Sequence, residues 1–216
     1  MSYTSAEHAV ITSHILEADK LHITPWVLEE KSKGGSFSER EGIAFLGSFG
    51  HLPNREAVEY LLDEIMPLLF KANPDIYLYV YGSNMPADYA EYESKNVHMV
   101  GFVDNLDKIF HKHRIFVAPL LSGAGIKGKV LEAIAYGVPC IASEVAAEGI
   151  GLTHGVSALI ADAPDDWVNA IGQLYDDEVL WSRLVANENI MAAEKYSFEH
   201  GVAEFRKILV SVGLYC

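Results

Sequence analysis

From residue 43 onward, short apolar runs alternate with longer amphipathic stretches, and this alternation constrains the fold more than any other feature. The apolar runs contain few polar side chains, which is typical of strands buried on both faces of a parallel sheet. Parallel strands need crossover connections, and the amphipathic stretches are long enough to supply crossover helices. The sequence therefore predicts an α/β domain with a doubly wound, six-stranded parallel sheet. The predicted strands are residues 43–47, 76–81, 97–100, 115–118, 139–142 and 158–160.

The amphipathic stretches and the N-terminal segment complete the predicted organisation. We expect crossover helices at residues 55–71, 87–94, 106–112, 129–136 and around 146–149, followed by three C-terminal helices at 165–176, 178–194 and 198–212. The N-terminal segment is predicted to contain a helix over 5–20 capped by Ser5, a short strand within 23–28, and a charged Ser/Gly linker over 29–42. We interpret residues 1–42 as an appendage to a domain spanning 43–216.

Charge and cysteine content exclude several classes of function. Sixteen Lys and Arg stand against 30 Asp and Glu, so the net charge is −14 and the surface repels nucleic acid and anionic membranes. Cys140 and Cys216 are too few for a disulfide framework, and Cys140 lies in an apolar run where a buried free thiol is expected. No run approaches the ~20 apolar residues of a membrane span. We therefore expect a cytoplasmic protein without a membrane-spanning segment or a nucleic-acid partner.

The loops that follow the strands are the places to look for a ligand site, because ligands bind at the carboxyl ends of such sheets. After the first strand, Gly47 and Ser48 begin a loop in which glycines permit close backbone approach, and Asn54 is expected to cap the next helix. A tight turn followed by a helix cap would explain the same residues. After the third strand, Phe102 and Val103 offer an apolar wall, with Asp104 or Asn105 as caps of the next helix.

The loop after the fourth strand has the composition of an anion site. Gly123, Gly125 and Gly128 alternate with Lys127 and Lys129 just before a predicted helix. Free backbone N–H groups, a positive helix end and two ammonium groups suit a diphosphate. Between Lys108 and Leu131 there are no acidic residues and five basic ones, namely Lys108, Lys112, Arg114, Lys127 and Lys129. We interpret this stretch as a local anion site, although two lysines that merely solvate a turn remain an alternative.

Two further groups of titratable residues bear on the site. Glu132 falls about one turn into the predicted helix, from where a carboxylate can reach the hydroxyls of a ligand whose phosphates lie at the helix end. A favourable interaction of the Glu132 carboxylate with the helix dipole would explain its position equally well. His111 and His113 diverge on a helix and have no Cys or carboxylate at ligand spacing, so we expect surface histidines and no metal site.

Residues 123–150, GAGIKGKVLEAIAYGVPCIASEVAAEGI, resemble the donor-nucleotide segment of the group 1 (family 4-like) glycosyltransferases of GT-B architecture. The stretches GSFGHLPNREAVEYLLDEIMPLL, NPDIYLYVYG and NVHMVGFVDNL are similar to the strand–loop–helix units that precede that segment, so the resemblance runs from about residue 43 to 209. It implies a Rossmann-like C-terminal domain that binds a nucleotide sugar, a UDP- or GDP-sugar, for retaining transfer to an acceptor without a required cofactor.

The resemblance also implies roles for particular residues. Lys127 and Lys129 would stabilise the departing diphosphate, the backbone from Gly125 to Lys129 would cradle it, and Glu132 would bond the ribose hydroxyls. Phe102 and Val103 would line the base. The remaining residues that the resemblance places at the nucleotide sugar are Gly47, Ser48, Gly123 and Gly128.

The chain departs from the family pattern at three points. Many relatives carry a second carboxylate eight positions before the helix glutamate, where this chain has Ala124, and many carry an arginine where this chain has Ser48. The third departure is that only residues 1–28 precede the linker, whereas GT-B enzymes have an N-terminal acceptor domain of comparable size. We expect a donor-binding half that binds nucleotide sugar but transfers poorly alone.

Two other interpretations remain open from the sequence. Residues 123–128 satisfy the G-x-G-x-x-G pattern of a nicotinamide dehydrogenase, and Glu144 lies where a ribose-binding acid is found. That fingerprint usually opens the first strand–helix unit, whereas here it follows the fourth strand. The other alternative is a binding or assembly module without catalysis, which Ala124 and the missing acceptor half favour.

Overall fold

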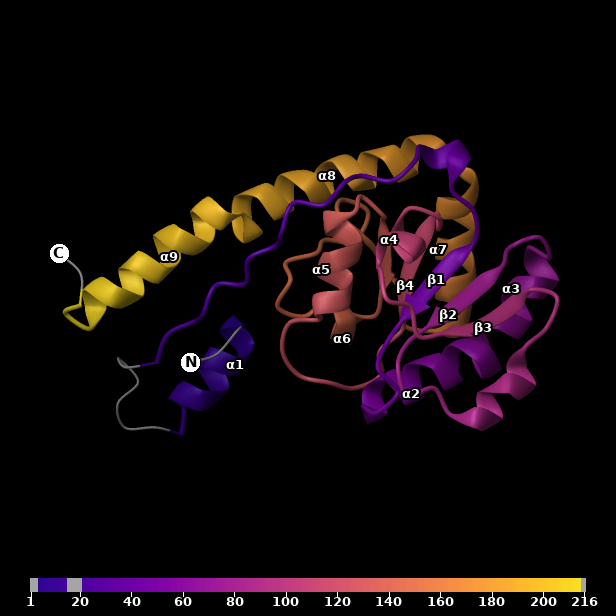
Figure 1. Ribbon diagram of the computed structural model, residues 1–216, viewed down its shortest axis with the longest axis horizontal. Helices are drawn as coiled ribbons and strands as arrows, with labels where there is room; N and C mark the ends of the chain where they lie inside the picture. The colour runs from indigo at the N-terminus through magenta and orange to yellow at the C-terminus, as the bar shows by residue number, and fades with distance from the viewer. Residues whose placement is uncertain (1–3, 15–20, 215–216) are drawn as a thin grey trace.

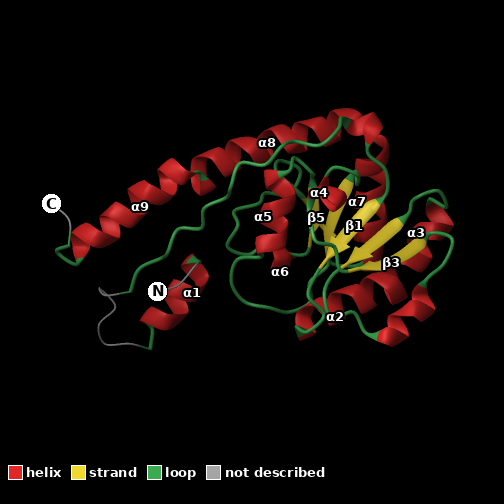
Figure 2. Ribbon diagram, viewed as in Figure 1, coloured by secondary structure: helices red, strands yellow, loops and turns green. Residues whose placement is uncertain are grey.

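The computed structural model describes residues 4–14 and 21–214 and contains a six-stranded, entirely parallel sheet (Figures 1 and 2). The strand order across the sheet is β3-β2-β1-β4-β5-β6. All six predicted strands are confirmed, and the central strands at 43–46 and 115–118 are entirely apolar and buried except for the half-buried Leu46. The strands are β1 Ile43–Leu46, β2 Leu78–Tyr81, β3 Val97–Gly101, β4 Ile115–Ala118, β5 Cys140–Ala142 and β6 Leu159–Ile160.

The strand order reverses between β1 and β4, which are hydrogen-bonded neighbours with Ile43 opposite Ile115. Strands before this point are added on one side of β1, and strands after it are added on the other. The loops that leave β1 and β4 therefore diverge and open a crevice at the carboxyl edge, which is the usual ligand position in doubly wound sheets. The fold places the predicted glycine loop at this crevice.

Helices cover both faces of the sheet. On one face α3 (Met66–Ala72) contacts α7 (Pro164–Asp176), and on the other α5 (Gly128–Ala135) contacts α8 (Glu178–Tyr196). The predicted helix over 55–71 is a continuous helical segment of α2, η3 and α3, with a π-helical stretch at η3. Pro67 lacks the N–H needed for an ordinary helical bond, which accounts for the widened turn before it. The bounds are α2 Leu52–Tyr60, η3 Leu61–Ile65 and α3 Met66–Ala72.

The remaining crossover segments lie near their predicted positions, but several are shorter. The predicted helix over 87–94 is a 3-10 helix, and the segment around 146–149 begins earlier, because Ser143 caps it through the backbone N–H of Ala146. These elements are η4 Ala87–Tyr92, α4 Asp107–Phe110, α5 Gly128–Ala135, α6 Glu144–Ala147, α7 Pro164–Asp176, α8 Glu178–Tyr196 and α9 Phe198–Ser211.

The N-terminal segment differs from its prediction in several respects. Helix α1 spans Ser5–Thr12, and its cap is Thr4 rather than Ser5, because Thr4 and Glu7 form a reciprocal capping box. The rest of the helix predicted over 5–20 includes residues 15–20, which lie outside the described residues. Residues 23–28 add no strand to the sheet. Pro25 has no N–H to donate, and the Leu28 N–H is bonded to the Tyr196 carbonyl at the end of α8.

Residues 29–42, predicted as a linker, are bound to the domain along α8 (Figure 1). The Lys33 ammonium donates to the Ala135 carbonyl over 2.7 Å, and the short 3-10 helix η2 Phe37–Glu39 contacts α8. Arg40 is only 1% exposed and donates to the carbonyls of Phe110 and Tyr136, where α4 and α5 end. A guanidinium with several fixed donors satisfies the carbonyls that helices leave unpaired at their ends.

His113 contradicts the expectation of surface histidines, because its side chain is fully buried. The ring is hydrogen-bonded to the Tyr81 hydroxyl over 2.7 Å and to the Glu41 carbonyl over 3.1 Å. Burial lowers the pKa of His113 to about 4, so the ring is neutral at physiological pH. Cys140 is a buried free thiol as predicted. Among the described helices, none is long and apolar enough to cross a membrane.

Candidate functional site

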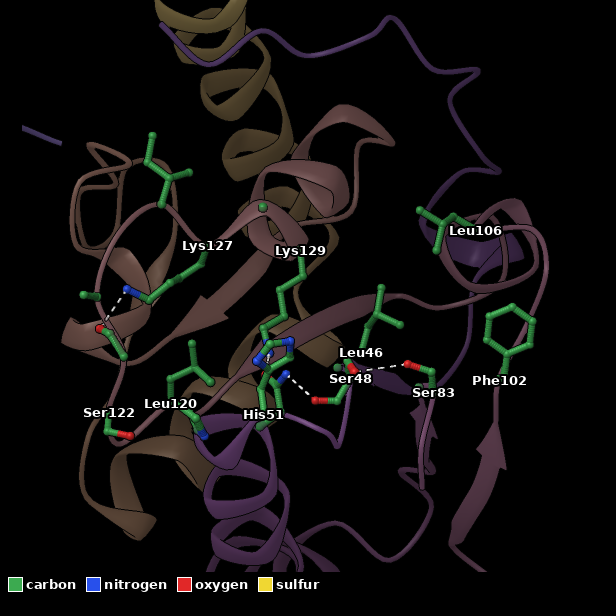
Figure 3. Close-up of a pocket in the computed structure, with 18 of the residues that line it drawn as sticks. Leu46, Ser48, His51, Ser83, Phe102, Leu106, Leu120, Ser122, Lys127 and Lys129 are labelled. Atoms are coloured by element: carbon green, nitrogen blue, oxygen red, sulfur yellow. Dashed lines mark hydrogen bonds between the residues drawn. The ribbon is translucent and has the colours of Figure 1, made fainter. Parts of the chain in front are cut away.

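A cavity of about 700 Å³ lies at the carboxyl ends of the strands, between the loops after β1 and β4 (Figure 3). It contains the predicted glycine loop, the predicted base wall and the loop that leaves β1. Ser83, which follows β2, also lines it. The predicted site residues that line this cavity are Gly47, Ser48, Phe102, Val103, Gly123, Lys127, Gly128 and Lys129.

Close backbone contact shapes the floor of the cavity at Gly47 and Gly82. A Cβ atom at Gly82 would lie 1.7 Å from the Gly47 carbonyl oxygen, so only glycine fits there. The Ser83 hydroxyl donates to the Ser48 hydroxyl over 3.1 Å (Figure 3). The loops after β1 and β2 are thereby joined beneath the cavity.

The loop after β1 differs from its prediction at Asn54. Helix α2 begins at Leu52 with His51 as its N-cap residue, so Asn54 lies inside the first turn and does not cap the helix. Its side-chain N–H donates to the Ser48 carbonyl over 2.8 Å, which fixes the amide and directs its oxygen toward Lys129. Asn54 and His51 both line the cavity, although neither is predicted from the sequence to bind a ligand.

Lys127 is 7% exposed, and its ammonium is folded back onto its own loop (Figure 3). It donates to the Gly125 carbonyl over 2.7 Å and to the Gly123 carbonyl over 3.1 Å. Burial lowers the pKa of Lys127, and the carboxylates of Glu148 and Glu7 act in the opposite direction. The side chain is thus a desolvated cation at the wall of the cavity.

Lys129 extends from the first turn of α5 toward the loop after β1. Its ammonium is hydrogen-bonded to the Asn54 side-chain oxygen and lies 4.8 Å from the centre of the Phe45 ring. Burial lowers the pKa of Lys129 to about 7, and repulsion from Lys127 adds to the effect. A diphosphate at the cavity would stabilise the protonated form, so anion binding and protonation of Lys129 are coupled.

Gly125 and Glu132 do not line the cavity. Gly125 has φ +76°, and a Cβ there would contact Glu7 of α1 at 3.2 Å. Glu132 is half-buried on α5, and one of its carboxylate oxygens is buried without a hydrogen bond from any described residue. Glu132 also contributes to raising the pKa of Lys31, after the larger effect of the Lys31–Glu29 hydrogen bond. A buried acceptor without a donor is costly, so a hydrogen-bond donor that reached this oxygen would stabilise it.

The base side of the cavity is apolar and open. Phe102 is 72% exposed at the rim, with Val103 and Leu106 beside it. The predicted cap at Asp104 or Asn105 is wrong, because Leu106 is the N-cap residue of α4 and makes no side-chain cap bond; the Asn105 side-chain oxygen accepts from the Asp107 N–H over 2.8 Å in the turn that precedes the helix. An exposed aromatic ring beside a polar cavity is a suitable surface for stacking a nucleobase.

Of the five basic residues predicted to form an anion site, Lys127 and Lys129 line the cavity. The side chains of the other three do not line the cavity, because each interacts with a different partner. Lys108 pairs with Asp104 over 2.6 Å, and the Lys112 ammonium lies 4.4 Å from the centre of the Tyr79 ring. Arg114 donates to the Tyr175 carbonyl at the end of α7. Within the described residues, no group of His, Cys, Asp and Glu side chains is arranged to hold a metal ion.

The family model described as "Glycosyl transferases group 1" matches residues 40–177. An uncharacterized 44.6 kDa protein in the cps region of Klebsiella pneumoniae is 25% identical over 167 residues, covering 72% of this chain and 39% of that protein. The structure of a TarM mutant from S. aureus, with fondaparinux, alpha-GlcNAc-glycerol and UDP, aligns with TM-score 0.82 and 14% identity, covering 96% of this chain and 43% of TarM.

A third match is the C-terminal domain of LpcC, a group 1 family glycosyl transferase from Francisella tularensis. It aligns with TM-score 0.61 and 18% identity, covering 81% of this chain and 97% of that domain. This chain therefore spans less than half the length of TarM and of the Klebsiella protein. The match to the family model covers more than half of the chain and includes the glycine loop and the cavity. This chain belongs to the group 1 glycosyltransferases.

Proposed function

We propose that this chain is the nucleotide-sugar-binding, C-terminal unit of a retaining glycosyltransferase. The observation that carries the proposal is the cavity at the β1/β4 crevice, where Lys127, Lys129 and the N-terminus of α5 converge. Together they form a positive site in a chain whose net charge is −14. These nearby positive groups attract an anion, whereas the net negative charge of the whole molecule repels it.

The proposed ligand is a UDP- or GDP-sugar, with its parts distributed along the cavity. The base lies against Phe102 and Val103, and the diphosphate lies at the glycine loop. Glu132 is outside the residues that line the cavity, so in this proposal the cavity wall rearranges to let the ribose hydroxyls reach its buried, unpartnered oxygen. The presence of UDP in the TarM complex supports a uridine nucleotide. A cytoplasmic location accords with the use of such a donor.

In the proposed reaction, the bond between the sugar C1 and the diphosphate oxygen breaks, and an acceptor hydroxyl forms a new bond to C1. The acceptor proton leaves with the departing nucleoside diphosphate or passes to solvent. Negative charge develops on the diphosphate as the bond breaks, and the ammonium groups of Lys127 and Lys129 with the α5 N-terminus stabilise it. In this proposal the lysines and the helix end stabilise the leaving group without a metal ion.

The acceptor would be held by a second unit that this chain does not supply. Two findings support that arrangement: the chain covers 43% of TarM, and it covers 97% of the LpcC C-terminal domain. We expect the chain alone to bind donor and to transfer poorly. Ala124, which lines the cavity where many relatives carry a carboxylate, favours a second candidate function as a nucleotide-binding module without transfer.

A panel of nucleotides tests the proposal directly. UDP, GDP, ADP, NAD and NADP are added to the chain, and the midpoint of thermal unfolding is measured, followed by calorimetric titration of any stabilising ligand. Stabilisation by one nucleoside diphosphate supports the proposal and identifies the base. Stabilisation by NAD or NADP alone, or by none of the five, contradicts it. Donor hydrolysis and transfer, measured with and without an acceptor-binding unit, distinguish the enzyme from the module.

A further inference from the structure

The loop after β1 presents one imidazole to the cavity. His51 lines the cavity together with Ser48 and Asn54, and its side chain is exposed (Figure 3). The ring makes no hydrogen bond with any described residue. Lys127 and Lys129 approach the same cavity from the other loop, the one that follows β4.

The other polar groups near the diphosphate position already make hydrogen bonds within the protein. The Lys127 ammonium donates to two carbonyls of its own loop, and Lys129 donates to Asn54. The Ser48 hydroxyl accepts from Ser83. Each lysine ammonium has three N–H donors, so Lys127 and Lys129 keep at least one for a phosphate oxygen, and the same oxygens can accept from His51 without any of these bonds being broken.

The backbone at His51 is held in place before a ligand arrives. The His51 N–H donates to the Ser48 carbonyl over 3.1 Å, and the Asn54 N–H donates to the His51 carbonyl over 3.1 Å. The Asn54 side chain also donates to the Ser48 carbonyl in the same turn. A donor on a fixed turn loses little conformational entropy when it binds an anion, and the positive end of α2 begins at the next residue.

We propose that the His51 imidazole donates a hydrogen bond to the diphosphate of the nucleotide sugar. The loops after β1 and β4 would then contact the diphosphate from two sides. This inference rests on the proposed function and adds a binding residue to it. His51 would supply part of the anion contact in a chain that has Ser48 where many relatives carry an arginine.

The test measures the affinity of the full chain for UDP, GDP and uridine by calorimetry or competition. His51→Ala and His51→Phe both remove the N–H donor, and Phe keeps an aromatic ring. His51→Gln keeps a donor. Leu52→Ala is the matched control, because Leu52 is exposed at the start of the same helix and does not line the cavity. Thermal unfolding midpoints confirm that each variant is folded.

For the diphosphate that binds the unaltered chain, we expect about tenfold weaker affinity in His51→Ala and His51→Phe, since one charge-assisted hydrogen bond is lost. His51→Gln should lose less, while Leu52→Ala and the uridine affinity of all variants should stay within twofold. Unchanged diphosphate affinity in His51→Ala, wild-type affinity in His51→Phe, or an equal loss of uridine affinity would overturn the inference. Failure of the unaltered chain to bind either diphosphate would instead overturn the proposed function.

Discussion

The Lys129 ammonium donates a hydrogen bond to the side-chain oxygen of Asn54, and this contact joins the first turn of α5 to the first turn of α2. Asn54 has its own side-chain N–H bonded to the Ser48 carbonyl, so the amide cannot turn its oxygen away without losing that bond. The loops that diverge from β1 and β4 are thus connected through the half-buried Lys129 side chain. The contact places a desolvated ammonium group at the cavity.

Protonation of Lys129 should make the stability of the fold depend on pH. The pKa of Lys129 is lowered to about 7, so between pH 7 and about 10 the unfolded chain binds more protons than the folded chain. Stability therefore rises with pH across this window, and the cost of burying the charge is complete below pH 7. Lys129→Met removes that cost.

Urea denaturation of the unaltered chain and of Lys129→Met at pH 6, 8 and 10 checks the prediction. We expect the variant to be more stable at pH 6 by on the order of 1 to 3 kcal/mol and the difference to shrink by pH 10. A difference between the two proteins that does not change with pH would contradict the burial of a titrating Lys129.

Asn54→Asp should remove most of this pH dependence between pH 7 and 9. A carboxylate in place of the amide oxygen would pair with the ammonium and raise the pKa of Lys129. Nucleoside diphosphate affinity should fall at the same time, because the new negative charge lies beside the phosphates. The comparison is Asn54→Leu, which removes the contact and adds no charge. The same pH profile in Asp and Leu variants would argue against this electrostatic role.

Replacing both Lys127 and Lys129 by Ala should weaken nucleoside diphosphate binding about a hundredfold or more, because two charge-assisted contacts are lost. The double variant Lys108→Ala/Lys207→Ala is the control. It removes the same charge from exposed side chains paired with Asp104 and Glu204. Calorimetric titration should show near-normal affinity in the control. Equal losses in both double variants would indicate general charge attraction instead of a specific site.

Glu132→Gln should weaken binding only for nucleotides that carry ribose hydroxyls. The unpartnered carboxylate oxygen would accept from these hydroxyls, and an amide in its place offers a weaker acceptor. We expect UDP or GDP affinity to fall about tenfold in the variant. The matching 2′,3′-dideoxynucleotide should bind the variant and the unaltered chain alike. A loss of the same size for both nucleotides would place the ribose elsewhere.

Arg40→Met should destabilise the whole domain by about 3 kcal/mol. The variant leaves the carbonyls of Phe110 and Tyr136 buried without their donor, and the loss of such charge-assisted bonds is costly. The control is Arg183→Met, since Arg183 is exposed on α8. Free energies of unfolding from urea titrations compare the two. A loss below 1 kcal/mol would show that water replaces the guanidinium at these helix ends.

Local sequence patterns were sufficient to predict the strands and most of the helices. Apolar runs such as 115–118 are buried wherever the chain packs, so their burial follows from composition alone. The glycine loop was recognisable for a similar reason, because Gly123 and Gly128 stand beside Lys127 and Lys129 along the chain. The Thr4 cap and the start of α2 were missed by a few residues, because helix ends depend on single hydrogen bonds that neighbouring residues can equally make.

Contacts between distant parts of the chain decided the rest. The sequence determined that there are six buried strands with a glycine-rich, basic loop after the fourth. Only the tertiary structure placed β1 beside β4 and so brought Asn54 to Lys129. It also buried Arg40 and His113 and left His51 facing the cavity. The physical reason is that the burial and hydrogen bonding of a polar side chain depend on which partners surround it, and these partners come from segments far away in the sequence.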